Sequence, residues 1–410
     1  MPATEGKIAN LVLNRIRALK TAPASGEGAD YAEHPTDIAK QVSLREAQFS
    51  DFEQVCALNL RLGQGPDSVE NWRRLWRENP ALAGTKEAAP IGWVLETSHE
   101  IVGFLGSIPL QYEFRGAVLR AAATCRFAVD PAYRAFSHLL VVSFFRQKNI
   151  DLFLNTTATA AAAKMMTAVK ASPMPQSDYG TVLFWVLDAR QFTKAVFDKM
   201  GVQKSLQGAG SAIAALLLKA DRAIRSRAPR ATSSKYRIQK TSVHEAGPEF
   251  ERLWSDFARH TPRLWARHSW EVLRWHFDPP GNRRVSVVLG CYAGDELMGY
   301  AVVRHEPCCA GEIRRSLVAD LLAREDDPEV VEQLLAAALG SAQDAGCHVL
   351  EVMGFPDSIR QVARRSKPYA RGYPAHPFYF KARDRDLQEA LIDRDAWYAC
   401  PFDGDATLWP

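Results

Sequence analysis

One stretch of the sequence, residues 127–140, combines residue types that suit the capture of an anion. Three apolar residues end at Asp130-Pro131, an arginine follows at position 134, and a helical pattern begins near Ser137. The first turn of a helix has unpaired N–H groups and a partial positive charge, so it attracts phosphates. Arg134, Ser137 and His138 add side-chain donors there. Joints of strand, turn and helix are also common without a ligand. These residues alone therefore leave open whether the joint binds an anion or only connects two elements.

The sequence motifs of several other enzyme classes are absent. There is no glycine-rich dinucleotide fingerprint and no Walker-type loop, which argues against dinucleotide binding and nucleotide hydrolysis. There is also no Gly-x-Ser-x-Gly elbow and no His-Glu-x-x-His helix, so serine hydrolase and zincin chemistry lack support.

The seven cysteines form an odd set without a Cys-x-x-Cys pair. Cys308 and Cys309 lie near His305, but adjacent cysteines do not easily occupy two corners of one metal site, so we expect no metal. The apolar start at residues 8–13 is interrupted by polar residues and does not read as a secretory signal. We therefore expect free thiols and a location in the reducing cytoplasm.

The composition is that of an ordinary globular protein. The 410 residues are 47% hydrophobic and 24% charged, and this length implies about two or three domains. Lys and Arg number 51 against 47 acidic residues, a net charge of +4 that is too small for us to expect a nucleic-acid partner. The longest apolar run, residues 209–218, ends at Lys219. Because a membrane span needs about 20 apolar residues, we expect no transmembrane segment.

The first folded region is predicted to span residues 41–205. It follows residues 1–40, which contain a basic amphipathic pattern at 7–20 and are predicted to form a flexible arm. Apolar runs predict strands, and apolar residues at helical spacing predict helices. The expected strands cover residues 42–47, 91–96, 101–110, 112–114, 119–129, 151–155 and 183–187, and the expected helices cover residues 50–62, 137–148 and 158–170.

A second folded region, residues 235–410, is predicted to follow a helical connector at residues 206–234. The order of elements recurs there: strands at 236–241, 285–293, 297–305, 316–322 and 349–353, and helices at 249–259, 328–345 and 357–364. A repeat of this length indicates two copies of one domain and not a solenoid. The predicted fold class is α/β (α+β), with two mixed, mostly antiparallel sheets flanked by helices.

In this setting the joint at residues 127–140 resembles motif A of the GCN5-related N-acetyltransferase (GNAT) superfamily. The family binds the pyrophosphate of acetyl-CoA where a strand runs through a Pro-x-Tyr-Arg turn into a helix, and residues 131–134 read Pro-Ala-Tyr-Arg. Residues 101–104, Ile-Val-Gly-Phe, resemble the preceding strand of the family. The resemblance covers residues 41–200, and a weaker resemblance to the same family covers residues 236–400. It implies two tandem GNAT-like domains and acetyl-CoA or another acyl-CoA as co-substrate, without a metal.

The resemblance also implies the positions of the cofactor site. Carried onto this sequence, the motif marks Ala128, Val129, Arg134, Ala135, Phe136, Ser137, His138, Leu139 and Asn155. Asn155 ends the next predicted strand, where the family often has an asparagine near the CoA arm. Leu139 stands where the family keeps a small residue. It either crowds the phosphate or packs against the sheet as part of the core.

The second half resembles the C-terminal copy of tandem acyltransferases, including relatives linked to polysaccharide synthesis and FemAB-like enzymes. This resemblance rests on residues 299–303 (Gly-Tyr-Ala-Val-Val), on Trp397-Tyr398 and on Asp403-Gly404-Asp405. At the position of the first joint, this half has an acidic turn at residues 323–328. Because carboxylates repel pyrophosphate, we expect this copy to have lost the CoA site.

The family transfers an acyl group from a CoA thioester to an amine, so the resemblance implies a CoA-dependent N-acyltransferase with an amine-bearing acceptor. Backbone N–H groups on the strand that ends at Val129 would stabilise the thioester oxygen. The acid–base candidates are Glu96, Cys125 and Tyr179, the last because the predicted helix at 158–170 has no tyrosine. The alternative is a non-catalytic tandem GNAT-fold scaffold or ligand-binding protein in surface-polysaccharide assembly.

Overall fold

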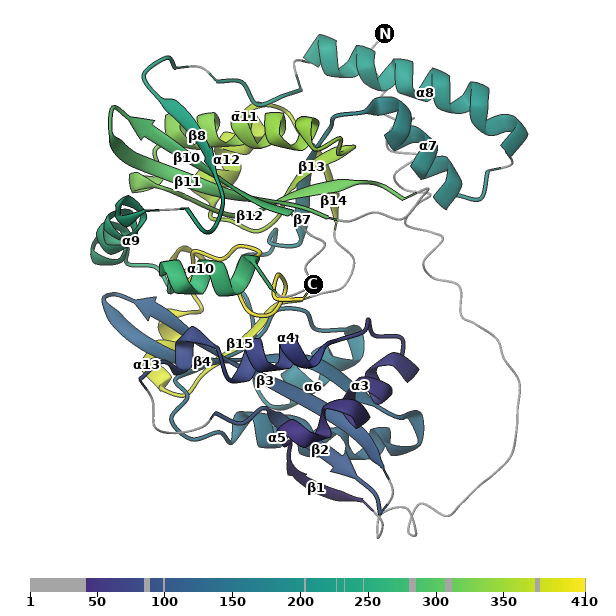
Figure 1. Ribbon diagram of the computed structural model, residues 1–410, viewed down its shortest axis with the longest axis vertical. Helices are drawn as coiled ribbons and strands as arrows, with labels where there is room; N and C mark the ends of the chain where they lie inside the picture. The colour runs from purple at the N-terminus through teal and green to yellow at the C-terminus, as the bar shows by residue number, and fades with distance from the viewer. Residues whose placement is uncertain are drawn as a thin grey trace.

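The computed structural model describes residues 42–84, 89–98, 100–202, 204–225, 227–231, 233–245, 247–279, 285–306, 312–372 and 377–409. The predicted arm, residues 1–40, lies outside these ranges. Two β-sheets lie one above the other, and the last described residues run between them (Figure 1). Each sheet is mostly antiparallel and is flanked by helices, so the predicted fold class is confirmed.

The first sheet is built mainly from the first half of the chain. Its strand order is β1 (Ser43–Glu46), β2 (Gly92–Glu96), β3 (Ile101–Phe114), β4 (Ala117–Val129), β5 (Leu152–Asn155), β15 (Tyr379–Ala382) and β6 (Ser172–Pro173), with β9 (Trp265–Ala266) beside β3. Every pairing is antiparallel except that of β4 with β5. A parallel pair needs a crossover connection, which a helix supplies here.

Helices cover both faces of the first sheet. They are α3 (Phe52–Arg61), α4 (Val69–Trp76), α5 (Ser137–Phe145) and α6 (Ala160–Ala168), with short 3-10 turns η1 (Phe49–Asp51), η2 (Pro80–Leu82) and η3 (Pro131–Phe136). Leu58 of α3 and Trp72 of α4 belong to the same buried cluster as Phe104 of β3, whereas Phe144 of α5 is clustered with Leu105. Because both faces are buried, the central strands read as continuous apolar runs and not as alternating ones.

The second sheet has the same plan. Its strand order is β14 (Tyr369–Gly372), β7 (Thr181–Val186), β13 (Val349–Val352), β12 (Arg315–Ala323), β11 (Glu296–His305), β10 (Val285–Ala293) and β8 (Arg237–Thr241). Its helices are α9 (Pro248–His260), α10 (Trp270–Phe277), α11 (Pro328–Asp344) and α12 (Asp357–Arg365), with η4 (Arg324–Asp326) before α11; α13 (Arg385–Ala390) and η5 (Arg394–Ala396) follow later in the chain. Strands β12 and β13 are parallel, as β4 and β5 are in the first sheet.

Each half of the chain contributes one strand to the other's sheet, and the second half also adds the two-residue strand β9 beside β3. Strand β7 comes from the first half and pairs antiparallel with β13 and β14 in the second sheet. Strand β15 comes from the second half and pairs antiparallel with β5 and β6 in the first sheet. Both exchanged strands occupy the equivalent place, beside the second strand of the parallel pair. The predicted units, residues 41–205 and 235–410, thus complete each other's sheets.

Residues 397–409 connect the two sheets through buried hydrogen bonds. The hydroxyl of Tyr398 donates to the carbonyl oxygen of Leu321 on β12 at 2.5 Å. Asp403 accepts a hydrogen bond from the hydroxyl of Tyr112 on β3 at 2.8 Å. The segment therefore contacts the central strands of both sheets within a few residues.

A helical hairpin follows β7. Helix α7 (Ala189–Lys199) begins after Asp188, whose carboxylate accepts the N–H groups of Arg190 and Gln191, and it packs against α8 (Lys204–Arg225) at the edge of the second sheet (Figure 1). The sequence pattern predicted a helical connector at residues 206–234, where α8 lies, and did not predict α7.

We predict that residues 42–202, expressed without the second half, lack a cooperative unfolding transition. Without β15, strand β5 has an unpaired edge, and the apolar strand β7 has no sheet to enter. Circular dichroism during heating measures this, with the uncut chain of residues 42–409 as control. Mixing the fragment with residues 233–409 should restore one transition. A cooperative melt of residues 42–202 alone would contradict the prediction.

Candidate functional site

The parallel pair β4–β5 separates before β4 ends. The two strands are paired only from Ala121 with Leu152 to Ala123 with Leu154. Strand β4 continues for six more residues to Val129, and along these its other neighbour, β3, stays paired. Among the described residues no strand pairs with this length of β4 on the side of β5. Backbone groups of β4 on that side are therefore left for other partners.

A β-bulge marks the point where β4 turns away. The register with β3 shifts between Phe104 and Gly106, and Arg126 on β4 has a positive φ of 50°. Gly106 is required opposite Cys125, because a Cβ there would approach the Cys125 sulfur to 2.5 Å. A bulge bends its strand and increases its twist. The bulge therefore aims the end of β4, with Ala128 and Val129, toward the turn that follows.

That turn places an exposed arginine before a helix. Arg134 lies in η3, and no hydrogen bond or ion pair of its side chain is found among the described residues. No side chain caps the first turn of α5. Asp130, the nearest acid in the chain, is held by Arg61 with N–O distances of 2.7 and 3.2 Å. The N–H of Ser137 already donates to the carbonyl oxygen of Arg134. The turn thus presents a free cation and the N–H groups that follow Ser137, with its one carboxylate neutralised.

Ser137 and His138 each have a partner within the turn. The Ser137 hydroxyl donates to the carbonyl of Arg134 at 2.5 Å, and Nδ1 of His138 lies 2.8 Å from the carbonyl oxygen of Ala135. Both side chains bond to the turn that precedes them. They shape the turn, so Arg134 is the side chain left to meet a ligand from solvent.

Leu139 belongs to the core under α5. Its half-buried side chain packs against the apolar cluster that contains Leu140 and Phe144. Of the two readings drawn from the sequence, packing against the sheet is the one that matches this placement. The remaining two predicted positions of the turn lie at the surface, with Ala135 exposed and Phe136 half-buried.

The equivalent joint of the second half is filled by its own carboxylates. Asp327 caps α11 by accepting the N–H of Glu329 at 2.8 Å. Asp326 accepts hydrogen bonds from Arg263 and Ser358, each at 2.6 Å. The helix start that no side chain caps in the first half is thus capped by a carboxylate in the second. The loss of a phosphate site there stays a prediction.

The three acid–base candidates are not brought together. Glu96 lies on β2, where Arg45 holds its carboxylate at 2.7 Å and keeps its pKa below the usual value. Burial raises the pKa of the Cys125 thiol well above its usual value, so this thiol stays protonated. Tyr179 is buried away from the joint, donates to the carbonyl of Cys400 at 3.1 Å, and also has a pKa raised by burial.

Sequence reasoning missed the polar group at the end of β5. Asn155 is followed by Thr156 and Thr157, and both hydroxyls donate to Asp405 at 3.0 Å. Asp405 is buried, and burial raises its pKa. Trp409 donates its indole N–H to the same carboxylate at 3.3 Å. The motif Asp403-Gly404-Asp405 was visible in the sequence, but nothing local indicated that it contacts a strand of the other half.

Asp403 and Asp320 form a second buried group between the sheets. Asp403 accepts from Tyr112 and from the backbone N–H of Cys400. Asp320 on β12 accepts from Tyr300 at 2.5 Å and lies 3.0 Å from Nε2 of His268. Loss of hydration raises the pKa of Asp403 to about 6. The polar contacts between the sheets thus depend on carboxylates that are costly to bury unpaired.

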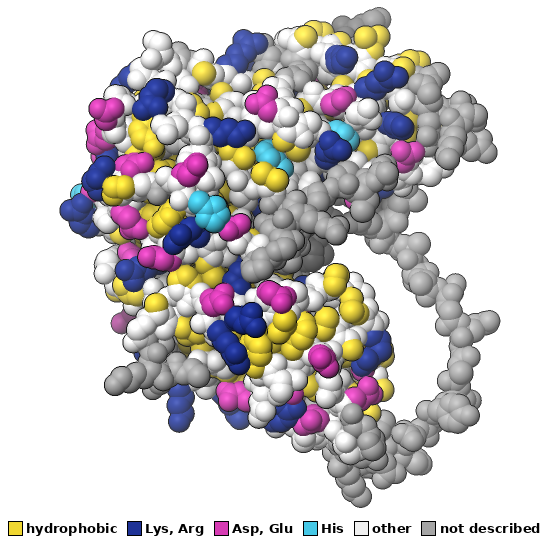
Figure 2. All heavy atoms as spheres, in the orientation of Figure 1, with side chains coloured by type: hydrophobic (Ala, Val, Ile, Leu, Met, Phe, Trp, Pro, Cys, Tyr) yellow, Lys and Arg dark blue, Asp and Glu magenta, His cyan; other side chains and the backbone are white. Residues whose placement is uncertain are grey.

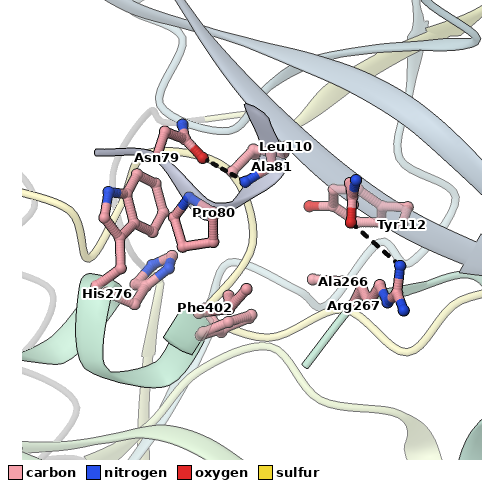
Figure 3. Close-up of a pocket in the computed structure, with 12 residues that line it drawn as sticks. Asn79, Pro80, Ala81, Leu110, Tyr112, Ala266, Arg267, His276 and Phe402 are labelled. Atoms are coloured by element: carbon pink, nitrogen blue, oxygen red, sulfur yellow. Dashed lines mark hydrogen bonds between the residues drawn. The ribbon is translucent and has the colours of Figure 1, made fainter. Parts of the chain in front are cut away.

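A small cavity lies beside this group, between η2, β3 and α10 (Figure 3). Pro80, Leu110, Tyr112, His276 and Phe402 line it, and its volume is about 20 Å³. That volume holds about one water molecule and excludes an acyl chain. Burial lowers the pKa of His276 well below its usual value, so the ring is neutral. We therefore place no substrate here.

The fold has solved counterparts. No family model matches the chain, and no curated protein does. A GCN5-related N-acetyltransferase from Anabaena variabilis ATCC 29413 superposes with a TM-score of 0.54 and 9% identity, covering 84% of this chain and 73% of its own. A conserved protein of unknown function from Enterococcus faecalis V583, described as a probable N-acyltransferase, gives a TM-score of 0.53 and 8% identity, covering 83% and 72%.

At these identities the likeness is one of fold. It confirms the GNAT fold that the joint predicted. The resemblance to FemAB-like enzymes and to proteins of polysaccharide synthesis stays a prediction. Within the described ranges, no group of three or more His, Cys, Asp or Glu side chains is placed to hold a metal ion.

We predict that Leu139→Gly destabilises the protein without improving acyl-CoA binding. The change removes a half-buried side chain from the cluster under α5 and adds the helix cost of glycine, together about 2–3 kcal/mol. Thermal melts with and without acetyl-CoA measure both effects. A rise in ligand stabilisation would contradict this and would mean that Leu139 restricts the phosphate site.

We predict that Asp403 makes stability fall as pH rises. Its pKa of about 6 in the folded state lies above the ordinary value of 3.8, so the folded protein binds this proton more tightly. The stabilisation is complete below about pH 4 and is lost by about pH 7, a change of about 3 kcal/mol.

Urea unfolding at several pH values tests this prediction. The unfolding free energy of the wild type should fall by about 3 kcal/mol relative to that of Asp403→Asn across that range, because asparagine has no proton to lose. Asp386→Asn, at an exposed position, serves as the matched control. A difference that stays constant with pH would refute the assignment.

Proposed function

We propose that the chain is a CoA-dependent N-acyltransferase, which transfers an acyl group from a CoA thioester to an amine. The observation that carries the proposal is the joint after β4. There a strand that has lost its parallel neighbour runs through Pro131 and the free cation Arg134 into an uncapped helix. The fold shared with the Anabaena N-acetyltransferase supports the same activity.

The residues of the joint suit the two charged parts of the reaction. The uncapped start of α5 and the exposed Arg134 provide N–H groups and a positive charge for the CoA pyrophosphate. The backbone of β4 between Thr124 and Val129 offers donors for the thioester oxygen as it becomes anionic. The acyl group would then lie where β4 and β5 separate, close to Asn155.

The hydrogen bonds of Thr156 and Thr157 with Asp405, just beyond β5, have a positioning role in this proposal. Asp405 holds the hydroxyls of Thr156 and Thr157, and its own position is set by the segment that crosses between the sheets. These contacts determine where β5 ends and how far it separates from β4. We do not carry Glu96, Cys125 or Tyr179 into the mechanism. Glu96 is ion-paired, burial keeps the Cys125 thiol protonated, and the buried Tyr179 hydroxyl already donates to the carbonyl oxygen of Cys400.

We predict one acetyl-CoA site per chain, with Arg134 as its main side-chain contact. Isothermal titration with acetyl-CoA and longer acyl-CoAs measures the stoichiometry and the affinity. Arg134→Ala should weaken binding by about 1.5–3 kcal/mol, roughly 10- to 150-fold, because a charge-assisted contact to phosphate is lost. Arg146→Ala is the matched control, since Arg146 is exposed at the other end of α5.

Two results would count against the proposal. Equal weakening by both substitutions would mean that binding reflects diffuse charge, and two equivalent sites would mean that the acidic joint of the second half also binds. Release of free CoA in the presence of amines tests catalysis. Binding of one acyl-CoA without release of CoA across a panel of amines would favour the alternative of a non-catalytic ligand-binding protein.

A further inference from the structure

Helix α8 carries a stripe of exposed apolar side chains. Ile213, Leu216, Leu217 and Ile224 are 62%, 69%, 58% and 83% exposed. Their spacing of three, four and seven residues places them on one face of a helix. In Figure 2 hydrophobic side chains gather at the top of the molecule, where Figure 1 places α8. The other large exposed apolar residues in the described chain are scattered over different elements.

Other side chains of α8 attach the helix to the protein. Ala215 is buried in a cluster with Phe184 and Val349 of the second sheet. The carboxylate of Asp221 lies 2.6 Å from both Nε of Arg227 and the hydroxyl of Tyr369 on β14. The stripe therefore lies on the outward face of a helix that is held in place, and its side chains are not part of the buried core.

The same segment has a large surplus of positive charge. Residues 189–231 contain nine lysines and arginines and two aspartates, whereas the whole chain has a net charge of only +4. The remainder of the chain is thus net negative. Lys219 is exposed on α8 within the length of the stripe. A partner for this surface must accept apolar side chains and carry negative charge.

We propose that the α7–α8 hairpin docks on an anionic lipid surface, with the α8 stripe buried in the acyl region and the surrounding cations at the headgroups. An amphipathic helix with cations around its apolar face lies in the plane of a membrane interface in this way. Within the described residues no helix is long and apolar enough to cross a membrane, so the contact is a surface one.

Other occupants satisfy only part of these observations. A nucleic acid offers negative charge but no hydrocarbon for four exposed aliphatic side chains. A second copy of the hairpin, or the predicted basic helix at residues 7–20, offers apolar contacts but brings positive charge against positive charge. The proposal stands apart from the acyltransferase function, because none of its residues belongs to the β4–α5 joint.

Vesicle flotation with the full chain tests the proposal. The protein should bind vesicles of equal parts phosphatidylcholine and phosphatidylglycerol at least about ten-fold more tightly than phosphatidylcholine alone, and high salt should weaken the binding. The double variant Leu216→Gln/Leu217→Gln should bind the anionic vesicles at least about ten-fold less tightly. Ile392→Gln, which changes a residue 59% exposed in the other part of the molecule, should bind as the wild type does.

A charge variant and two further measurements complete the experiment. Lys219→Glu should weaken binding to the anionic vesicles about five-fold or more. This variant provides the test if the double variant does not melt like the wild type. Absence of binding to anionic vesicles, or equal binding by wild type and both variants, overturns the proposal. So does a wild-type dimer in sedimentation that the double variant abolishes. Acetyl-CoA titration of the same variants should be unchanged, which separates this test from that of the acyltransferase.

Discussion

Three buried aspartates set the relation between the two sheets. A carboxylate that loses its water must be hydrogen-bonded, so each of the three requires donors at fixed positions. Their donors come from both halves of the chain: Tyr112, Thr156 and Thr157 for Asp403 and Asp405, and Tyr300 with His268 for Asp320. The segment after Trp397 cannot shift without leaving one of them unpaired. The end of β5, and with it the separation from β4, depends on this segment.

The two repeats show how one backbone plan supports different chemistry. Each has a strand, a 3-10 turn and a helix beside a parallel strand pair. In the first repeat the carboxylate of Asp130 is neutralised by Arg61, and the helix start stays open. In the second repeat the carboxylate of Asp327 itself caps the helix. The electrostatic character of the joint therefore depends on the position of one or two acids.

The parts of the structure that the sequence predicted well are those that depend on local pattern. Most strands and helices were placed within a few residues, and the joint at Pro131 and Arg134 lies where the sequence indicated. The strand exchange was not predicted, because short apolar strands such as β7 and β15 carry no sign of the sheet they enter. The contact of Tyr112 with Asp403 spans 291 residues, and no local rule links two such positions. The carboxylate beside β5 was missed for the same reason.

The exchanged strands also impose an order of events on synthesis. A ribosome makes the chain from its N-terminus, and β5 leaves it roughly 220 residues before its neighbour β15. At about 5–20 residues per second, the first sheet waits about 10–45 s for this strand. For most of that time the apolar strand β7 has emerged, but its neighbours β13 and β14 have not been made. The nascent chain therefore exposes unpaired apolar strands, which is the kind of surface that chaperones bind, and the two repeats must finish folding together at the end of translation.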